Sequence, residues 1–399
     1  MHYGWVVVAA CLVVGLCGYG TYFAFTLFYA HLVAEFGWGR AAISGAMSLG
    51  LAVYGLFAFP MGWCADRFGP RPTVIVGGAL FGVGTALGGA ITELWHLYAL
   101  YGGLSAAGMG AAWSPLVSTV SRWFDRKRGL AVGITVLGGG IGIFVIAPLT
   151  EFLIGQFGWR AAYLWLGAIS GGSIVGSALL LVRTPADKGL APYGASGRST
   201  VPRTNIAATV AFVRDLRFWR MSLTFGLWWF AGAIVYVHIA PFMLEKGLDS
   251  RAAALVFTLF GVGNCLGRVA AGVLSDRMGA LRVYRLTIGA SAALMSAFAL
   301  ADGAPGLLVL SCALGFAAGG ALTQFTTVAV ALFGTASAGA LMGAVLALVG
   351  LVGAGGPILS GAIHDASHSY APAFHVGAAV FLLSLLLSIG LQRRDRRVA

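Results

Sequence analysis

Two similar stretches of sequence, 210 residues apart, decide the fold of this chain. Residues 62–71 read GWCADRFGPR and residues 272–282 read GVLSDRMGALR, so Asp66 corresponds to Asp276. Repeats at one offset indicate two structurally similar halves. Three further pairs of similar segments share this offset to within one residue: 35–42 with 245–253, 124–129 with 333–339, and 159–163 with 370–374.

The composition around these repeats is that of a membrane protein. The 399 residues are 59% hydrophobic and 10% charged, with a mean hydropathy of +0.89, whereas a soluble domain is about 25% charged. We find twelve apolar segments long enough to cross a bilayer as helices, and one long polar stretch after the sixth. The sequence therefore predicts an all-α membrane protein with twelve transmembrane helices, arranged as two six-helix parallel repeats. The expected bundles are 1–182 and 218–399, joined by a cytoplasmic linker at 183–217.

The distribution of Lys and Arg predicts the orientation. If both termini and the even-numbered connections lie in the cytoplasm, that side carries 20 of the 25 Lys and Arg residues and the other side carries 4. This asymmetry favours cytoplasmic N- and C-termini. The short loops favour the inner membrane of a bacterium, and we expect a monomer. The net charge of +12 is thus explained by the cytoplasmic loops, and no nucleic-acid partner is expected beside the lipid bilayer.

The same segments resemble a known family of transporters. Residues 62–71 resemble the signature between the second and third helices of the major facilitator superfamily, and 272–282 lies where this superfamily usually carries a second copy. Residues 3–7, 122–131 and 264–268 resemble the monocarboxylate transporter and oxalate–formate antiporter group. The resemblance implies a substrate site near the membrane midplane, between the halves, and transport by alternating access.

Arg268 is the only charged residue well inside an expected span. An Arg at the bilayer centre costs at least ~2.5 kcal/mol on insertion scales, so this side chain must face protein or water. No carboxylate within a span can neutralise it, and a guanidinium binds carboxylates through two parallel hydrogen bonds. We therefore predict that Arg268 binds a small organic monocarboxylate anion. A structural role at an inter-helix gate is the alternative.

Several neighbours are candidates for the same site. Asn264 lies one helical turn before Arg268 and shares its face. Tyr19, Tyr22 and Phe23 share one face of the first span and predict a cavity wall, with aromatic packing as the alternative. Two further candidates, for which packing is again the alternative, are Trp113 and Gln324.

The resemblance also draws attention to cations and acids that this chain lacks. In the monocarboxylate transporter group the position of Asn264 often carries an Asp linked to proton coupling. Animal relatives place a Lys near Phe23, and relatives that bind dicarboxylates use a Lys at the position of Val349. With one cation in the cavity, we expect a single carboxylate rather than oxalate.

The repeated loop motif predicts a gate rather than a binding site. The resemblance implies that Asp66 and Arg71 belong to a charge network that closes the cytoplasmic side, with simple positive-inside anchoring as the alternative. The residues expected in this gating loop are Gly62, Asp66, Arg67, Gly69, Arg71, Asp276 and Arg277.

The sequence does not decide the driving ion or exclude several alternative functions. His238 is the best candidate for proton coupling, since imidazole changes charge near neutral pH; an interfacial hydrogen-bonding role is the alternative. Exchange for a counter-anion or facilitated diffusion needs no such group. The alternatives are an exporter of drugs or other hydrophobic solutes, a copper importer and a non-transporting receptor. No enzyme, cofactor or metal site is expected, because neither a nucleophile–base pair nor a ligand cluster is found.

Overall fold

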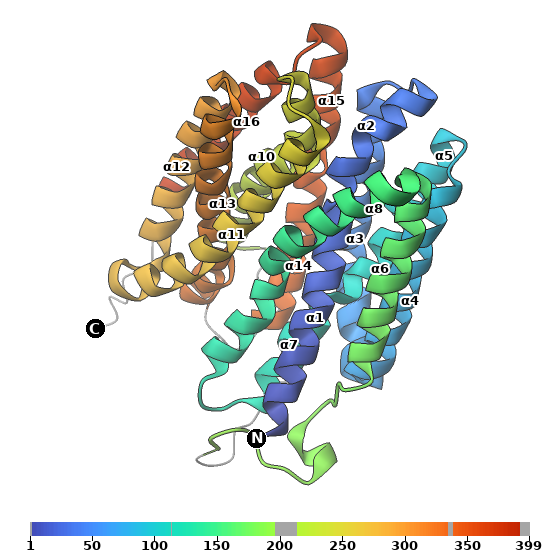
Figure 1. The fold of residues 1–399 in the computed structure, drawn as a ribbon. Helices are drawn as coiled ribbons and strands as arrows, with labels where there is room; N and C mark the ends of the chain where they lie inside the picture. The colour runs from blue at the N-terminus through green and yellow to red at the C-terminus, as the bar shows by residue number, and fades with distance from the viewer. Residues whose placement is uncertain (1, 113, 196–213, 334–337, 392–399) are drawn as a thin grey trace.

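The computed structural model describes residues 2–112, 114–195, 214–333 and 338–391, and these are almost entirely helical (Figure 1). The first part of the chain contains α1 (Tyr3–Phe23), α2 (Phe25–Phe36), α3 (Arg40–Phe68), α4 (Pro70–Leu87), α5 (Leu94–Leu97), α6 (Ala106–Met109), α7 (Ser114–Trp123) and α8 (Arg128–Ala178). The second part contains α10 (Leu216–Glu245), α11 (Ser250–Met278), α12 (Ala280–Leu300), α13 (Ala304–Phe333), α14 (Ala338–Gly353), α15 (Gly355–Ser367) and α16 (Ala371–Ile389).

Ten helical stretches of the described residues are long and apolar enough to cross a membrane. Two of the expected spans lie within α8, where Gly158 interrupts the helical conformation with a φ of 77°. The expected span at 95–121 is divided into short pieces, including a π-helical turn at Tyr98–Ser105. The number of twelve membrane-crossing segments therefore stays a prediction.

The repeated motif has the same local structure in both copies. Gly69 ends α3 with a φ of 97°, and Gly279 ends α11 with a φ of 85°. A residue with a Cβ rarely adopts these angles. The glycine that follows Asp-Arg and one apolar residue in each copy is therefore the point at which the helix ends and the chain turns into the next one.

The helices form two groups that follow the sequence (Figure 1). In the first group, α1 and α4 pack against α8. In the second group, α13 packs between α11 and α12, and α16 packs against α10 and α12. The groups meet where α8 crosses α11 and where α3 lies along α14 and α15. This crossing is close: a Cβ on Gly140 of α8 would lie 2.6 Å from the Cys265 Sγ of α11.

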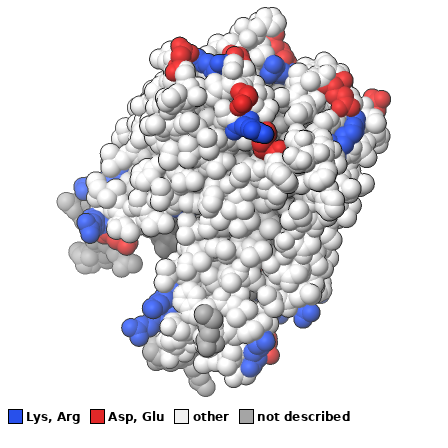
Figure 2. Space-filling view, in the orientation of Figure 1, with Lys and Arg blue, Asp and Glu red and all other residues white. Residues whose placement is uncertain are grey.

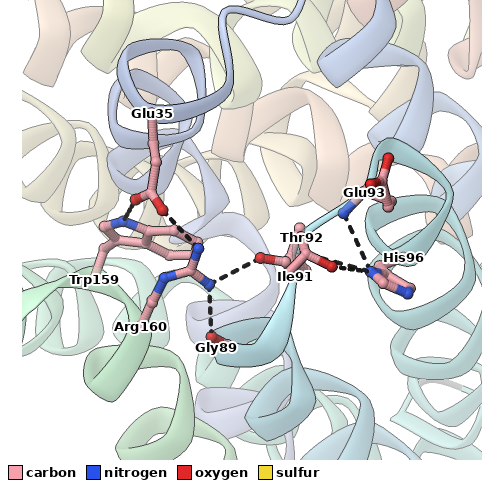
Figure 3. Close-up of polar contacts among 8 residues, drawn as sticks. All are labelled: Glu35, Gly89, Ile91, Thr92, Glu93, His96, Trp159 and Arg160. Atoms are coloured by element: carbon pink, nitrogen blue, oxygen red, sulfur yellow. Dashed lines mark hydrogen bonds and ion pairs between the residues drawn. The ribbon is translucent and has the colours of Figure 1, made fainter.

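One acidic residue ties the ends of three segments of the first group together (Figure 3). The Glu35 carboxylate accepts hydrogen bonds from Trp159 Nε1 at 2.7 Å and from Arg160 Nη2 at 2.6 Å. Arg160 Nη1 also donates to the carbonyl oxygens of Gly89 and Ile91, at 3.0 and 2.8 Å. The end of α2 is thereby joined to the second part of α8 and to the loop after α4.

The second group repeats this contact in a simpler form. Glu245, at the end of α10, accepts from the Tyr370 backbone N–H at 2.9 Å and from Ser369 Oγ at 2.7 Å. The sequence repeat aligns Glu35 with Glu245 and Trp159 with Tyr370. The repeat therefore extends to the side chains that hold the helix ends.

Charged side chains are concentrated at two ends of the molecule, and the face between them is uncharged in Figure 2. We call the end where α3 terminates and α8 begins the basic end. It carries Arg67, Arg71, Arg122, Arg126, Lys127 and Arg128. The opposite end, where α2 terminates and α3 begins, carries both acidic and basic residues. Figure 2 also shows an indentation between the two groups on the side of the basic end.

Candidate functional site

A cavity of about 80 Å³ lies between the two groups of helices. Nine of its nineteen described lining residues are aromatic, compared with 12% of the whole sequence, and the single charged one is Arg268. The cavity is thus an apolar chamber with one cation in its wall. The aromatic lining residues are Tyr19, Tyr22, Phe23, Tyr54, Phe225, Trp228, Trp229, Tyr236 and Phe325.

Arg268 is held on α11 by contacts to both groups, and its side chain is buried. Its Nε donates to Asn264 Oδ1 at 2.9 Å, and its Nη1 donates to the Val136 carbonyl oxygen of α8. Within the described part of the chain, Arg268 forms no ion pair and its Nη2 has no hydrogen-bond acceptor. A buried charge without an oppositely charged partner is costly. The site therefore favours an anionic ligand at Nη2.

Asn264 acts behind Arg268 rather than in the cavity wall. It is fully buried, and its Nδ2 donates to the Tyr236 hydroxyl at 3.3 Å. Because a guanidinium only donates, the amide oxygen must face Arg268 and the amide nitrogen must face Tyr236. This chain of two hydrogen bonds fixes the direction of the guanidinium.

The three predicted aromatic residues of α1 all line the cavity, together with a residue that the sequence analysis missed. Tyr54, on α3, places its hydroxyl 2.9 Å from the Tyr19 hydroxyl. The Phe23 ring lies 4.5 Å from the Tyr236 ring of α10, centroid to centroid. Tyr54 could have been recognised in the sequence as a tyrosine in the middle of an apolar span. Its contact with Tyr19 of α1 is visible only in the structure.

Comparison with known proteins decides the family. The model of the Major Facilitator Superfamily matches residues 10–256 and 230–399. The chain belongs to this superfamily. Its relatives include monocarboxylate transporter 11 of Mus musculus, 32% identical over 98% of this chain and 88% of the relative, and monocarboxylate transporter 13 of Bos taurus, 30% identical over 95% and 87%.

Solved structures show the same fold. A bacterial homolog of the human lysosomal transporter Spinster, in an inward-facing and unoccupied conformation, matches with a TM-score of 0.72 and 16% identity over 98% of this chain and 95% of that one. The nucleoside transporter NupG matches with a TM-score of 0.76 and 13% identity over 97% of this chain and 100% of that one. This member of the superfamily is thus a multi-pass membrane transporter related to the monocarboxylate transporters, not an enzyme.

Two other predicted site residues of this transporter lie elsewhere. Gln324, on α13, is fully buried and donates from Nε2 to the Ala271 carbonyl oxygen at 3.2 Å. It is not among the residues that line the cavity, whereas its neighbour Phe325 is. Trp113 lies outside the described residues.

His238 lies in the interface between the two groups, toward the opposite end, and does not line the cavity. Its Nε2 is 3.3 Å from Ser44 Oγ and 3.1 Å from the Pro357 carbonyl oxygen. Its ring stands 5.3 Å from that of Tyr29 and 4.9 Å from that of Tyr370, between centroids. His238 is therefore packed within the interface between the two groups.

The ion pair formed by the gating-loop residue Asp66 differs from the expected charge network. Asp66 forms an ion pair with Arg122, in the last turn of α7, and its carbonyl oxygen accepts from Arg183. The expected partner, Arg71, is exposed in the first turn of α4 and forms no ion pair with a described residue. The family resemblance implied Arg71, whereas the packing of α7 beside α3 places Arg122 next to Asp66.

The other residues of the motif serve the helix ends. The Arg67 guanidinium lies over the Trp63 ring, 5.3 Å from its centroid. A Cβ on Gly62 would lie 2.7 Å from Ser114 Oγ, so the glycine lets α3 approach α7. In the second copy, Asp276 and Arg277 are exposed and have no ion-pair partner within the described residues.

Proposed function

We propose that this chain is a secondary active or facilitative transporter of a small organic monocarboxylate, and that Arg268 binds the carboxylate. The observation that carries the proposal is the buried guanidinium at the cavity wall, without an acidic partner among the described residues. One cation balances one carboxylate. The names of the relatives, monocarboxylate transporters 11 and 13, support the same substrate class.

The proposal includes an orientation and an architecture. The basic end faces the cytoplasm, together with both termini, as the positive-inside rule requires. Two six-helix bundles, residues 1–182 and 218–399, move relative to one another around the cavity, with 183–217 as the cytoplasmic linker. The membrane is the inner membrane of a bacterium, and the transporter works as a monomer.

The distribution of contacts between the two groups supports an inward-facing state. Asp365, near the end of α15, accepts hydrogen bonds from the Arg40 and Ala41 backbone N–H groups at 3.0 and 2.9 Å. The Arg40 Nη1 donates to the Tyr370 hydroxyl at 2.9 Å. These bonds join the first helices of one group to the last helices of the other at the opposite end. At the basic end no hydrogen bond or ion pair between described residues links the groups.

In this proposal, coupling does not depend on an acidic residue of the protein. Asn264 stands where the family often carries an Asp, and no described acidic residue lines the cavity. We therefore propose exchange for a counter-anion, facilitated diffusion, or entry of the substrate with its own proton. His238 does not line the cavity, so the proposal gives it no part in coupling.

The test is a thermal-shift screen of purified protein and an Arg268→Gln variant, with Arg268→Lys as the charge-conserving control. Pyruvate, benzoate, oxalate, a lipophilic cation and Cu²⁺ are the probes. A ligand at ten times its Kd stabilises the native state by about 1.4 kcal/mol. We expect a monocarboxylate to stabilise the wild type, not Arg268→Gln, and Arg268→Lys only weakly. Equal stabilisation of wild type and Arg268→Gln would refute the role of Arg268.

The aromatic lining also favours one alternative, an exporter of hydrophobic solutes. The positive charge of Arg268 disfavours cationic compounds at the same wall. The lipophilic cation in the screen separates the two functions, because an exporter of such compounds would be stabilised by it regardless of Arg268.

A further inference from the structure

The rings of the cavity wall restrict the class of carboxylate that fits the site. We propose that the substrate is an aromatic monocarboxylate, with one carboxylate on or close to a planar ring, and not a two- or three-carbon acid. The inference rests on the proposed function, because it takes Arg268 to bind the carboxylate. It adds which side chains of the cavity bind the part of the substrate other than its carboxylate.

The aromatic side chains form a continuous wall that extends across both groups of helices. The Tyr19 ring lies 6.4 Å from the rings of Tyr54 and Phe23, between centroids. Phe23 in turn lies 4.5 Å from Tyr236 and 6.1 Å from Trp229. These separations are those of favourable ring pairs. A planar ligand ring can join the wall at several points in the same stacked or edge-to-face geometry.

Three of the four tyrosine hydroxyl groups in this wall have a hydrogen-bond partner among the described residues. Those of Tyr19 and Tyr54 bond to each other, and that of Tyr236 accepts from Asn264. Only Tyr22 Oη and Trp228 Nε1 are buried without a partner among the described residues of the wall. Tyr236 and one of the two tyrosines of the Tyr19–Tyr54 pair still have an O–H to donate. The wall can therefore bind one ligand hydroxyl, but a sugar acid with several hydroxyl groups would lose more hydrogen bonds to water than it gains. An aromatic body loses nothing of this kind.

Gly139 leaves space for the ligand beside the guanidinium. A Cβ at this position would lie 3.4 Å from the Tyr19 ring and 3.6 Å from Arg268 Nη2. The missing side chain thus opens a gap between a ring and the cation, where the bond from ring to carboxylate can lie.

The test compares benzoate with cyclohexanecarboxylate, which has the same charge and number of carbon atoms but no planar ring. Binding to the purified full-length protein is measured by titration calorimetry at pH 7.5, with pyruvate and acetate as small acids. Ring pairs contribute about 0.5–1.5 kcal/mol each beyond burial. We expect benzoate to bind about three- to tenfold more tightly than cyclohexanecarboxylate, and both small acids to bind more weakly still.

Two variants locate the effect in the wall. Phe23→Leu keeps an apolar side chain but removes a ring, and we expect it to lower the affinity ratio of benzoate to cyclohexanecarboxylate toward one. Phe28→Leu, which removes a buried ring outside the cavity lining, is the matched control and should leave the ratio unchanged. A third variant, Gly139→Ala, should weaken benzoate more than acetate, because its methyl group enters the gap beside Arg268.

The outcomes separate this inference from the proposed function. If pyruvate or acetate binds at least as tightly as benzoate, and binding is lost in Arg268→Gln, the inference is overturned and the proposed function stands. If benzoate and cyclohexanecarboxylate bind equally, the inference is also overturned. If no carboxylate binds the wild type, or if Arg268→Gln binds as the wild type does, both are overturned.

Discussion

At the residue scale, the site depends on how a buried guanidinium is held. Arg268 uses Nε and Nη1 for contacts within the protein and leaves Nη2 toward the cavity. A long side chain without such contacts would lose conformational entropy when it binds a ligand. Asn264 fixes the guanidinium through its hydrogen bond, and in the proposed function this removes part of that loss before the anion binds.

Asn264 gives a prediction at this scale. Asn264→Leu removes the acceptor for Arg268 Nε and the donor for Tyr236. A hydrogen bond to a charged group contributes about 1.5–3 kcal/mol, so we expect the affinity for the carboxylate to fall at least tenfold in titration calorimetry. Asn264→Asp restores an acceptor but adds a negative charge beside Arg268, and it should also lower the affinity for the carboxylate. Unchanged affinity in both variants would remove Asn264 from the site.

Tyr54 gives a second prediction, which separates ring from hydroxyl. Tyr54→Phe removes the hydroxyl contact with Tyr19 but keeps the ring, and we expect benzoate affinity to change by less than about threefold. Tyr54→Ala removes the ring, and its affinity should fall more. If Tyr54→Phe were as damaging as Tyr54→Ala, the hydroxyl pair would bind the substrate and the apolar account of the wall would be wrong.

The sequence identified Arg268 because a charge inside a span is conspicuous in one dimension. Asn264, Tyr19, Tyr22 and Phe23 followed from helical spacing relative to the same faces. The partner of Tyr19, by contrast, comes from α3, and the partner of Asp66 comes from α7. Spacing along the chain carries no information on such contacts between helices.

At the element scale, the ends of the helices are set by glycines in positive-φ conformations. Gly69 and Gly279 have them at equivalent positions of the two motif copies, and this could be predicted from the GPR and GALR endings. The division of the expected span at 95–121 into short pieces could not. Its π-helical stretch includes Gly102, where a Cβ would lie 2.8 Å from the Ala46 carbonyl oxygen of α3, and spacing along the chain does not reveal such a close approach.

Gly69 gives the prediction at this scale. Gly69→Ala places a Cβ on a residue with a φ of 97°, which costs roughly 1–2 kcal/mol for an L-residue. We expect a lower midpoint of thermal unfolding in detergent. Gly172→Ala is the control, because Gly172 lies within α8 and a Cβ there meets nothing within 4 Å. Equal effects of the two substitutions would argue against conformational strain as the cause.

At the scale of the whole molecule, the two groups are joined at the opposite end and at the level of Arg268, and not by polar contacts of described residues at the basic end. The repeat in the sequence predicted two similar halves. It did not predict which contacts between them are present, because spacing along the chain does not specify contacts between the halves. Asp365 is the clearest example, since its carboxylate accepts from the first backbone N–H groups of α3.

Asp365 gives the prediction at this scale. Asp365→Ala removes these bonds and should favour separation of the groups at the opposite end. Ser44, fully buried there beside His238, reports on this if it is replaced by cysteine in a variant without the five native cysteines. We expect Asp365→Ala to increase labelling of Ser44→Cys by a membrane-impermeant maleimide several-fold. Asp302→Ala, at the same end but bonded within one group to Lys246, should not.

The most direct test of the central claim is uptake of a labelled monocarboxylate into proteoliposomes that contain wild-type protein, Arg268→Gln or no protein. Trans-side unlabelled acid is included so that exchange and net uptake are both seen. We expect the wild type to take up label, and we expect Arg268→Gln to match protein-free vesicles although it folds with a similar unfolding midpoint. Undiminished uptake by Arg268→Gln would contradict the assignment of the carboxylate to Arg268.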